Sequence, residues 1–229
     1  MRCFVIGGSK GIGDGIAKSL CETHTVFVIS RHKSDDFLES HSLKYLYADL
    51  VNIDQIHGTI TQLIRDEPTC IVFSQRYRGD SLYEEIELMM QSPILLIQRL
   101  KPNLLPGSKI VFIGSVAGDH VVHNQSAAYH ATRAGIEGLT RYYAVTLASS
   151  GIQVFCVRPG TTLKPYNAGY FNDNPGVINH IIDRSPMSSL PSSNEVGNVV
   201  NNLITYNWPS VTGATIDVDT GTCLVYHGS

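Results

Sequence analysis

Residues 2–13 read Arg2-Cys3-Phe4-Val5-Ile6-Gly7-Gly8-Ser9-Lys10-Gly11-Ile12-Gly13, and this stretch decides the fold. An apolar run of strand length breaks into glycines, and an amphipathic, helix-length segment follows at Gly13–Glu22. Glycines at a strand-to-helix turn let the backbone approach a pyrophosphate, and the helix N-terminus offers N–H donors and positive potential. The spacing has the form GxxxGxG rather than GxGxxG. It predicts a nucleotide-binding turn after a buried first strand.

Beyond this turn, apolar strand-length segments alternate with helix-length segments along most of the chain. Several of the expected strands are apolar nearly throughout, as strands buried on both faces should be. They lie at Cys3–Ile6, Val26–Ser30, Leu43–Ala48, Cys70–Phe73, Lys109–Ile113, Gln153–Val157 and Thr215–Val218. The expected helices lie at Gly13–Glu22, Ile53–Asp66, Leu82–Leu100, Ala127–Ser149 and Glu195–Thr205. This alternation predicts a single-domain, Rossmann-type α/β fold, a doubly wound parallel sheet of about seven strands with helices on both faces.

Composition excludes several classes of protein. The chain has 229 residues, which suits one domain, and its 43% hydrophobic and 16% charged residues argue against disorder. A net charge of −3 without long runs of like charge indicates no nucleic-acid partner. No apolar stretch reaches the roughly 18 residues of a membrane helix, and no signal peptide is recognised. The five cysteines and nine histidines show no metal-ligand spacing, so we expect reduced thiols, no metal, no membrane partner and a cytoplasmic location.

The segment 160–191 breaks the strand–helix rhythm just after a strand end. It contains prolines and glycines at Pro165, Gly169, Pro175, Gly176, Pro186 and Pro191. Ligands of open α/β sheets bind outside the carboxyl ends of the strands. We therefore interpret this segment as a substrate loop or lid within a single domain spanning residues 1–229, in preference to a domain boundary.

The motifs, in their order and separation, resemble the short-chain dehydrogenase/reductase family over essentially the whole chain. They are Gly7-x3-Gly11-Ile12-Gly13, Asp49-Leu50, Gly114-Ser115-Val116-Ala117-Gly118, Tyr129 at the head of a helix, and Arg158-Pro159-Gly160. The resemblance implies a nicotinamide cofactor. The residues expected to bind it are Gly7, Ser9, Lys10, Gly11, Ile12, Gly13, Arg31, Asp49, Leu50, Ser74, Gln75, Pro159, Gly160 and Thr162.

The choice between NADP(H) and NAD(H) depends on the end of the second strand. An NAD site places an acidic residue on the adenosine ribose there, but this segment reads Ile29-Ser30-Arg31-His32-Lys33. Arg31 offers a planar, always-charged fork for a 2′-phosphate, and Lys10 can approach the same group. The sequence therefore favours NADP(H), with solvated surface cations as the alternative interpretation.

The family's chemistry needs a tyrosine hydroxyl that exchanges a proton with the substrate oxygen. Free tyrosine has a pKa near 10, so a neighbouring cation must favour the phenolate. The resemblance assigns this role to Tyr129, with Ser115 hydrogen-bonding the substrate oxygen. The family has Tyr-x3-Lys, whereas this chain has Tyr129-x3-Arg133. Arg133 shares a helix face with Tyr129 and keeps the charge, but it does not readily release a proton.

Two further departures from the family concern an asparagine and a loop. Met89 stands where the family carries an asparagine in the helix before the fifth strand. The family's Asn-Asn-Ala-Gly is replaced by Ser74-Gln75-Arg76-Tyr77 after the fourth strand. Arg76 and Arg78 bring two guanidinium groups to the sheet edge. They could bind a substrate carboxylate or phosphate, be solvated, or pair with Glu84 or Glu85.

These observations predict an NADP(H)-dependent oxidoreductase that interconverts a carbonyl and an alcohol on a small substrate. The substrate is either neutral or anionic. The expected catalytic residues are Ser115, Tyr129 and Arg133. The alternatives are a non-catalytic nucleotide-binding relative, because two of the family's four catalytic residues are changed, and an isomerase or lyase with a bound cofactor. In the family, the long helix expected here over Ala127–Ser149 and the helix before it usually pack between subunits. The resemblance therefore implies a homodimer or homotetramer.

Overall fold

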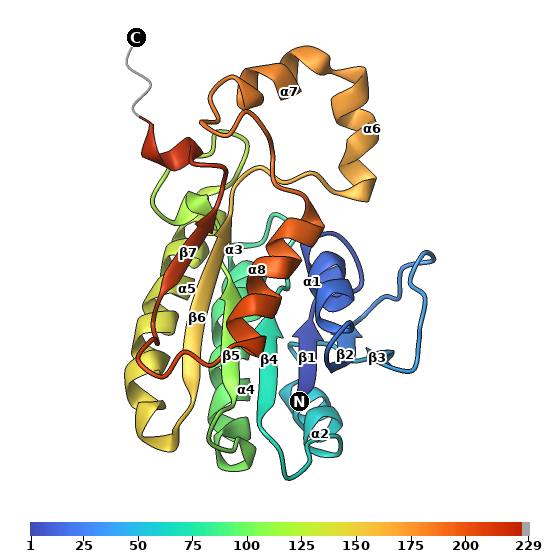
Figure 1. The fold of residues 1–229 in the computed structure, drawn as a ribbon, viewed down its shortest axis with the longest axis vertical. Helices are drawn as coiled ribbons and strands as arrows, with labels where there is room; N and C mark the ends of the chain where they lie inside the picture. Colours follow the sequence, from blue (N-terminus) through green and yellow to red (C-terminus); the bar gives the residue numbers. More distant parts are fainter. Residues whose placement is uncertain (226–229) are drawn as a thin grey trace.

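Seven parallel strands form one sheet in the order β3-β2-β1-β4-β5-β6-β7 (Figure 1). The computed structural model describes residues 1–225. The strands are β1 (Arg2–Ile6), β2 (Thr25–Ser30), β3 (Leu43–Tyr47), β4 (Thr69–Phe73), β5 (Lys109–Ile113), β6 (Gln153–Pro159) and β7 (Thr215–Val218). The order reverses between β1 and β4, and ligands of α/β folds bind at the carboxyl side of such a switch point.

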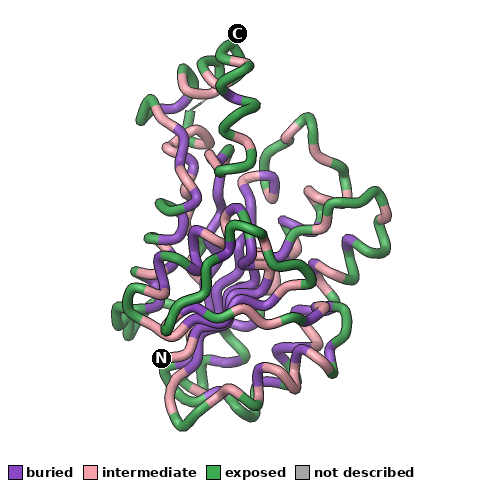
Figure 2. Tube along the Cα trace, turned by 90° about the vertical axis from the view of Figure 1, so that its right-hand side faces the viewer, coloured by how far each residue is buried: buried purple, intermediate pink, exposed green. Residues whose placement is uncertain are grey.

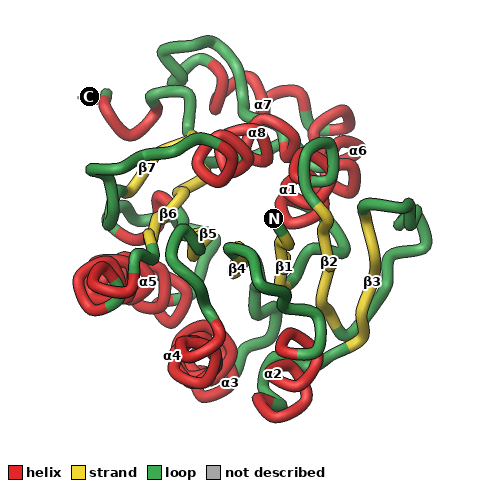
Figure 3. Tube along the Cα trace, turned by 60° about the horizontal axis from the view of Figure 1, so that its bottom comes forward, coloured by secondary structure: helices red, strands yellow, loops and turns green. Residues whose placement is uncertain are grey.

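Helices cover both faces of the sheet (Figure 3). One face carries α1 (Ile12–Leu20) and α8 (Ser193–Thr205), and the other carries α2 (Ile53–Thr61), α3 (Leu82–Ile86), α4 (Ser92–Leu100) and α5 (Ala127–Thr146). Strand side chains alternate between the two cores: Cys3 and Val5 pack with α1 and α8, whereas Phe4 and Ile6 pack on the opposite face. The inner strands β1, β2, β4, β5 and β6 are therefore buried on both sides (Figure 2), as their apolar sequences predict, whereas the edge strands β3 and β7 are partly exposed.

The expected fold class and all seven expected strands are confirmed, with small shifts of their ends. Three helices end earlier than expected. The helix expected over Gly13–Glu22 ends at Leu20. The helix expected over Ile53–Asp66 stops at Thr61, since its last turns contain Gly58 and β-branched residues with weak helix propensity. The helix expected over Ala127–Ser149 stops at Thr146, and a 3-10 turn then leads to Gly151 at φ 68°.

The helix expected over Leu82–Leu100 contains an internal irregularity. Between α3 and α4 the chain makes a π-helical turn at Glu87–Gln91. Pro93 explains it, because a proline cannot donate to the carbonyl four residues earlier and its ring clashes with that carbonyl. The wider turn relieves this conflict and keeps the chain helical through Met89, which is buried.

The segment 160–191 contains two helices that the sequence did not reveal, α6 (Pro165–Asp173) and α7 (Pro175–Ile182). They lie beyond the carboxyl ends of the strands (Figure 1). Pro165 and Pro175 occupy the first positions of these helices, where a missing N–H costs nothing and the fixed φ suits a helix. The segment is therefore more regular than the sequence suggested, and its role as a substrate loop or lid stays a prediction.

None of the helices within residues 1–225 is long and apolar enough to cross a membrane. In the same range, no group of three or more His, Cys, Asp or Glu side chains is placed to hold a metal ion. All five cysteines are free thiols, and Cys3, Cys70 and Cys156 are buried within the strands.

Candidate active site

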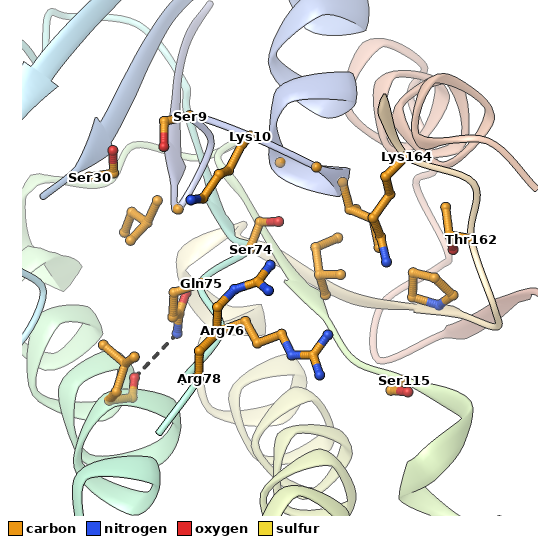
Figure 4. Close-up of a pocket in the computed structure, with 18 of the residues that line it drawn as sticks. Ser9, Lys10, Ser30, Ser74, Gln75, Arg76, Arg78, Ser115, Thr162 and Lys164 are labelled. Carbon is orange, nitrogen blue, oxygen red and sulfur yellow. Dashed lines mark hydrogen bonds between the residues drawn. The ribbon is translucent and has the colours of Figure 1, made fainter. Parts of the chain in front are cut away.

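A cavity of about 580 Å³ opens at the carboxyl ends of the central strands. Every residue that the sequence assigned to cofactor, catalysis or substrate lines it, from Gly7 in the first turn to Thr162 after β6. Figure 4 shows side chains entering this cavity from several separate segments, among them Lys10, Arg76 and Lys164. The sheet topology therefore brings residues far apart in the sequence to one place.

The glycine turn after β1 needs its glycines for geometric reasons. Gly7 and Gly11 have φ of 80° and 65°, the left-handed region that side chains disfavour. A Cβ at Gly13 would lie 2.4 Å from the Gly7 carbonyl oxygen. The turn is thus closely wound before α1, and its backbone stays accessible in the cavity beside Ser9 and Ile12.

The end of β2 presents cations to the same cavity. Arg31 is exposed, and its Nη1 lies 3.8 Å from Oδ2 of Asp49, which follows β3. Lys10 is exposed on the glycine turn, and Leu50 is buried next to Asp49. The part of the cavity near the end of β2 therefore offers two cations, Lys10 and Arg31, and the apolar side chain of Leu50. The Asp49 carboxylate lies beside Arg31.

Ser115, Tyr129 and Arg133 come together from β5 and α5. Ser115 directly follows Gly114 at the end of β5, and its Oγ accepts a hydrogen bond from the Ala117 N–H at 3.2 Å. Ser126 caps α5 by accepting from the Tyr129 N–H at 3.0 Å, so Tyr129 lies in the first turn. The Arg133 Cζ lies 4.7 Å from the centre of the Tyr129 ring. The fold thus places a hydroxyl and a guanidinium beside the tyrosine.

Electrostatics around Tyr129 favour its phenolate. Burial by itself raises the pKa of Tyr129, but the charge of Arg133, interaction with the Ser115 hydroxyl and the charge of Arg76 together lower it below its usual value. The Arg76 Cζ lies 5.2 Å from the centre of the same ring. Tyr129 is therefore suited to exchange a proton closer to neutral pH than free tyrosine.

Arg133 is buried, with 3% of its surface exposed. Its Nη1 donates to the Ile113 carbonyl at 3.0 Å, and its Nε has no partner within residues 1–225. Burial and the like charge of Arg76 lower the pKa of Arg133, whereas Tyr129 and Glu85 act in the opposite direction. Because free arginine titrates above 12, the guanidinium remains charged at neutral pH.

Arg76 and Arg78, both in the loop after β4, contact different partners. Arg76 Nη2 donates to the Gln125 side chain at 2.9 Å, and Arg78 Nη2 donates to the Tyr166 hydroxyl at 3.2 Å. Neither forms an ion pair with Glu84 or Glu85 in the described part of the chain, so that interpretation is wrong. Glu84 instead accepts from Tyr77, and the buried Glu85 accepts from Thr132.

The segment after β6 is held by a buried arginine. Arg158 makes ion pairs with Asp119, Glu137 and Asp217 at 2.6–2.9 Å. These carboxylates raise the pKa of Arg158 far above its usual value. Arg158 thereby fastens the end of β6 to neighbouring elements, which positions Pro159 and Gly160 at the cavity. Thr162 follows and donates to the Gly160 carbonyl at 2.9 Å.

Sequence reasoning missed residues that only the tertiary structure brings to the cavity. Tyr166 of α6 lies close to the glycine turn, since a Cβ at Gly11 would be 3.2 Å from its Cε1. Gln125 and Asn167 also line the cavity. No local motif marks these residues. Met89, by contrast, is packed in the core and does not line the cavity.

Comparisons with known proteins agree with this fold. The family described as enoyl-(acyl carrier protein) reductase matches residues 76–223. An uncharacterized oxidoreductase of Schizosaccharomyces pombe is 27% identical over 238 residues, covering 96% of this chain and 90% of the relative. A short-chain dehydrogenase family protein from Francisella tularensis has a TM-score of 0.81 at 25% identity, covering 98% and 99% of the two chains. The Pseudomonas aeruginosa RhlG/NADP active-site complex has a TM-score of 0.80 at 22% identity, covering 96% and 95%.

The fold and the cavity define a dinucleotide-binding oxidoreductase of the Rossmann type. The chain belongs to the short-chain dehydrogenase/reductase family.

Proposed function

We propose that this protein is an NADP(H)-dependent oxidoreductase that interconverts a carbonyl and an alcohol on a small substrate. The observation that carries the proposal is the position of Tyr129 between Ser115 and Arg133, in the same cavity as the glycine turn. A nicotinamide cofactor supplies or accepts the hydride when bound.

The residues of the cavity suit such a cofactor. The glycine turn offers accessible backbone next to the N-terminus of α1, which favours a diphosphate. Arg133 is buried, and its Nε has no hydrogen-bond partner among residues 1–225, so this N–H is available to a polar ligand. Arg31 and Lys10 favour NADP(H), and the RhlG complex of the same fold holds NADP.

In carbonyl reduction, Tyr129 is the general acid that donates its phenolic proton to the substrate oxygen. The Ser115 Oγ accepts from Ala117, and its O–H, which interacts with the Tyr129 oxygen, can donate to the substrate oxygen instead. Arg133 stabilises the phenolate left behind. Because neither Arg133 nor Met89 readily relays a proton, we expect water in the cavity to reprotonate Tyr129.

Tyr129→Phe tests the proposal, since it keeps the ring and removes only the transferred proton. We expect turnover with a panel of carbonyl compounds to disappear and NADPH affinity, measured by fluorescence titration, to stay within about twofold. Ser126→Ala is the matched control, because it weakens the helix cap without touching the hydroxyl. Retained turnover in Tyr129→Phe would refute this role for Tyr129.

A second candidate is a nucleotide-binding protein without catalysis. The specific observation in its favour is that the charge beside Tyr129 is carried by a buried Arg133, which does not release its proton. Arg133→Lys discriminates between the two. Faster carbonyl reduction in this variant supports an enzyme, whereas inertness of both forms across a broad panel, with intact NADPH binding, supports the second candidate.

We also propose that the protein self-associates as a homodimer or homotetramer through α5 and the preceding helix. Tyr142 and Val145 of α5 are 61% and 77% exposed, and a Cβ at Gly138 would meet no atom within 4 Å. Gly135, in contrast, packs against Met90 of its own chain. We expect light scattering to show an oligomer that Val145→Asp converts to a monomer. A monomeric unmodified protein would contradict the proposal.

A further inference from the structure

Arg76 is a cation beside Tyr129 that the fold leaves without an acidic partner. Its Cζ lies 5.2 Å from the centre of the Tyr129 ring, yet within residues 1–225 no carboxylate is within ion-pair distance of it. Arg158, which is buried, pairs with three carboxylates, whereas Arg76 is exposed to the cavity. An arginine left unpaired in a ligand cavity is suited to bind an anion brought by the ligand.

The guanidinium of Arg76 is held along one side only. Its Nη2 donates to Oε1 of Gln125 at 2.9 Å, and the Gln125 amide in turn donates to Asn124 at 3.3 Å. Its Nη1 and Nε have no acceptor in the described part of the chain. A planar fork that is tethered at one nitrogen and free at the others is positioned for a two-point contact with a carboxylate.

Arg78 has a different position, although it stands two residues away. Its Nη2 donates to the Tyr166 hydroxyl, and its Cζ lies 5.5 Å from the centre of that ring. Tyr166 in turn lies against Gly11, and the Lys164 ammonium is 5.8 Å from the same ring. Arg78 therefore lies near the glycine turn, where the cofactor phosphates are expected, and Arg76 lies beside the ring of Tyr129.

We propose that Arg76 binds a carboxylate of the substrate, and that the protein acts on short oxo acids and the matching hydroxy acids. This inference rests on the proposed function. The carbonyl carbon gains the hydride of the nicotinamide cofactor, the carbonyl oxygen gains the proton of Tyr129, and the carboxylate keeps its charge on Arg76. Since Arg76 and Tyr129 are neighbours, the carboxylate lies within a few bonds of the carbonyl. Arg78 has no part in this recognition.

The test compares each acid with its uncharged methyl ester. The probes are 2-oxobutanoate and 4-oxopentanoate with their methyl esters, reduced with NADPH by the unmodified protein, Arg76→Gln and Arg78→Gln. The ester-to-acid ratio of KM should be at least about tenfold for one acid in the unmodified protein, as expected for a charge-assisted hydrogen bond. Arg76→Gln should bring the ratio close to one, whereas Arg78→Gln, with the same loss of charge in the same loop, should leave it unchanged.

Two results would overturn the proposal. If Arg76→Gln lowers kcat equally for acids and esters, Arg76 acts on the acidity of Tyr129 and not on the substrate. If the ratio changes as much in Arg78→Gln, the loop acts only through its total charge.

Binding decides the question even without turnover, which separates this inference from the proposed function. Calorimetric titration with 2-hydroxybutanoate and its methyl ester, in the presence of NADPH, should show tighter binding of the acid that Arg76→Gln removes. Equal binding of acid and ester by the unmodified protein would overturn the proposal.

Discussion

Replacing Arg31 with alanine should remove most of the preference for NADPH over NADH. Arg31 is 57% exposed, and its pairing with Asp49 is loose, with 3.8 Å between Nη1 and Oδ2. Exposed pairs of this kind contribute about 0–1 kcal/mol, whereas a charge-assisted hydrogen bond to a phosphate contributes about 1.5–3 kcal/mol. The difference of about 0.5–3 kcal/mol corresponds to roughly 2- to 160-fold in affinity, with tenfold inside this range. We therefore expect NADPH to bind about tenfold more tightly than NADH.

The measurement is a titration of both cofactors by protein fluorescence or calorimetry, at fixed ionic strength because screening weakens exposed charges. In Arg31→Ala, the NADPH affinity should fall toward that of NADH, whose own affinity should change little. Lys33→Ala is the matched control. It removes the same charge from the same segment, but Lys33 pairs with Glu39 at 2.6 Å and does not line the cavity.

Equal affinities for the two cofactors in the unmodified protein would refute the argument that the end of β2 selects a 2′-phosphate. A preference that survives in Arg31→Ala and disappears in Lys10→Ala would instead assign the selectivity to the glycine turn.

Three further predictions concern catalysis, the fold and the glycine turn. In alcohol oxidation Tyr129 acts as a base, so activity is lost as the pH falls through the pKa of Tyr129. The midpoint of the pH–rate profile should lie below the pKa of about 10 for free tyrosine. Arg133→Met should move this midpoint upward, because it removes the charge that lowers the pKa of Tyr129. Lys109 donates to the carbonyls of Leu203, Ile204 and Tyr206 at the end of α8. Lys109→Met should therefore lower the free energy of unfolding, measured in urea, by about 2–4 kcal/mol. An unchanged free energy of unfolding would contradict the view that Lys109 stabilises the fold. Gly13→Ala should abolish cofactor binding, because the added Cβ would lie 2.4 Å from the Gly7 oxygen, whereas Gly58→Ala, where a Cβ meets no atom within 4 Å, should be tolerated.

The sequence by itself determined the sheet, the helices that flank it and the glycine turn. These features follow from local patterns. A short apolar run such as Cys70–Phe73 favours a strand buried on both faces, and glycine is favoured where the turn has a positive φ. The ends of helices were less certain, since the end of α2 reflects weak helix propensity near Gly58 and the π turn before Pro93 reflects a single missing N–H. Helices α6 and α7 were missed because proline starts a helix as readily as it ends one.

Only the tertiary structure decided which partner each charged side chain has. Arg76 and Arg78 are indistinguishable in sequence, yet one is held by Gln125 beside Tyr129 and the other by Tyr166 above the glycine turn. Arg158 is satisfied by three carboxylates from separate elements. Backbone periodicity is a local property that a short window of sequence reveals. The partner of a long, flexible side chain depends on segments that lie tens of residues away, and the folded chain alone brings these together.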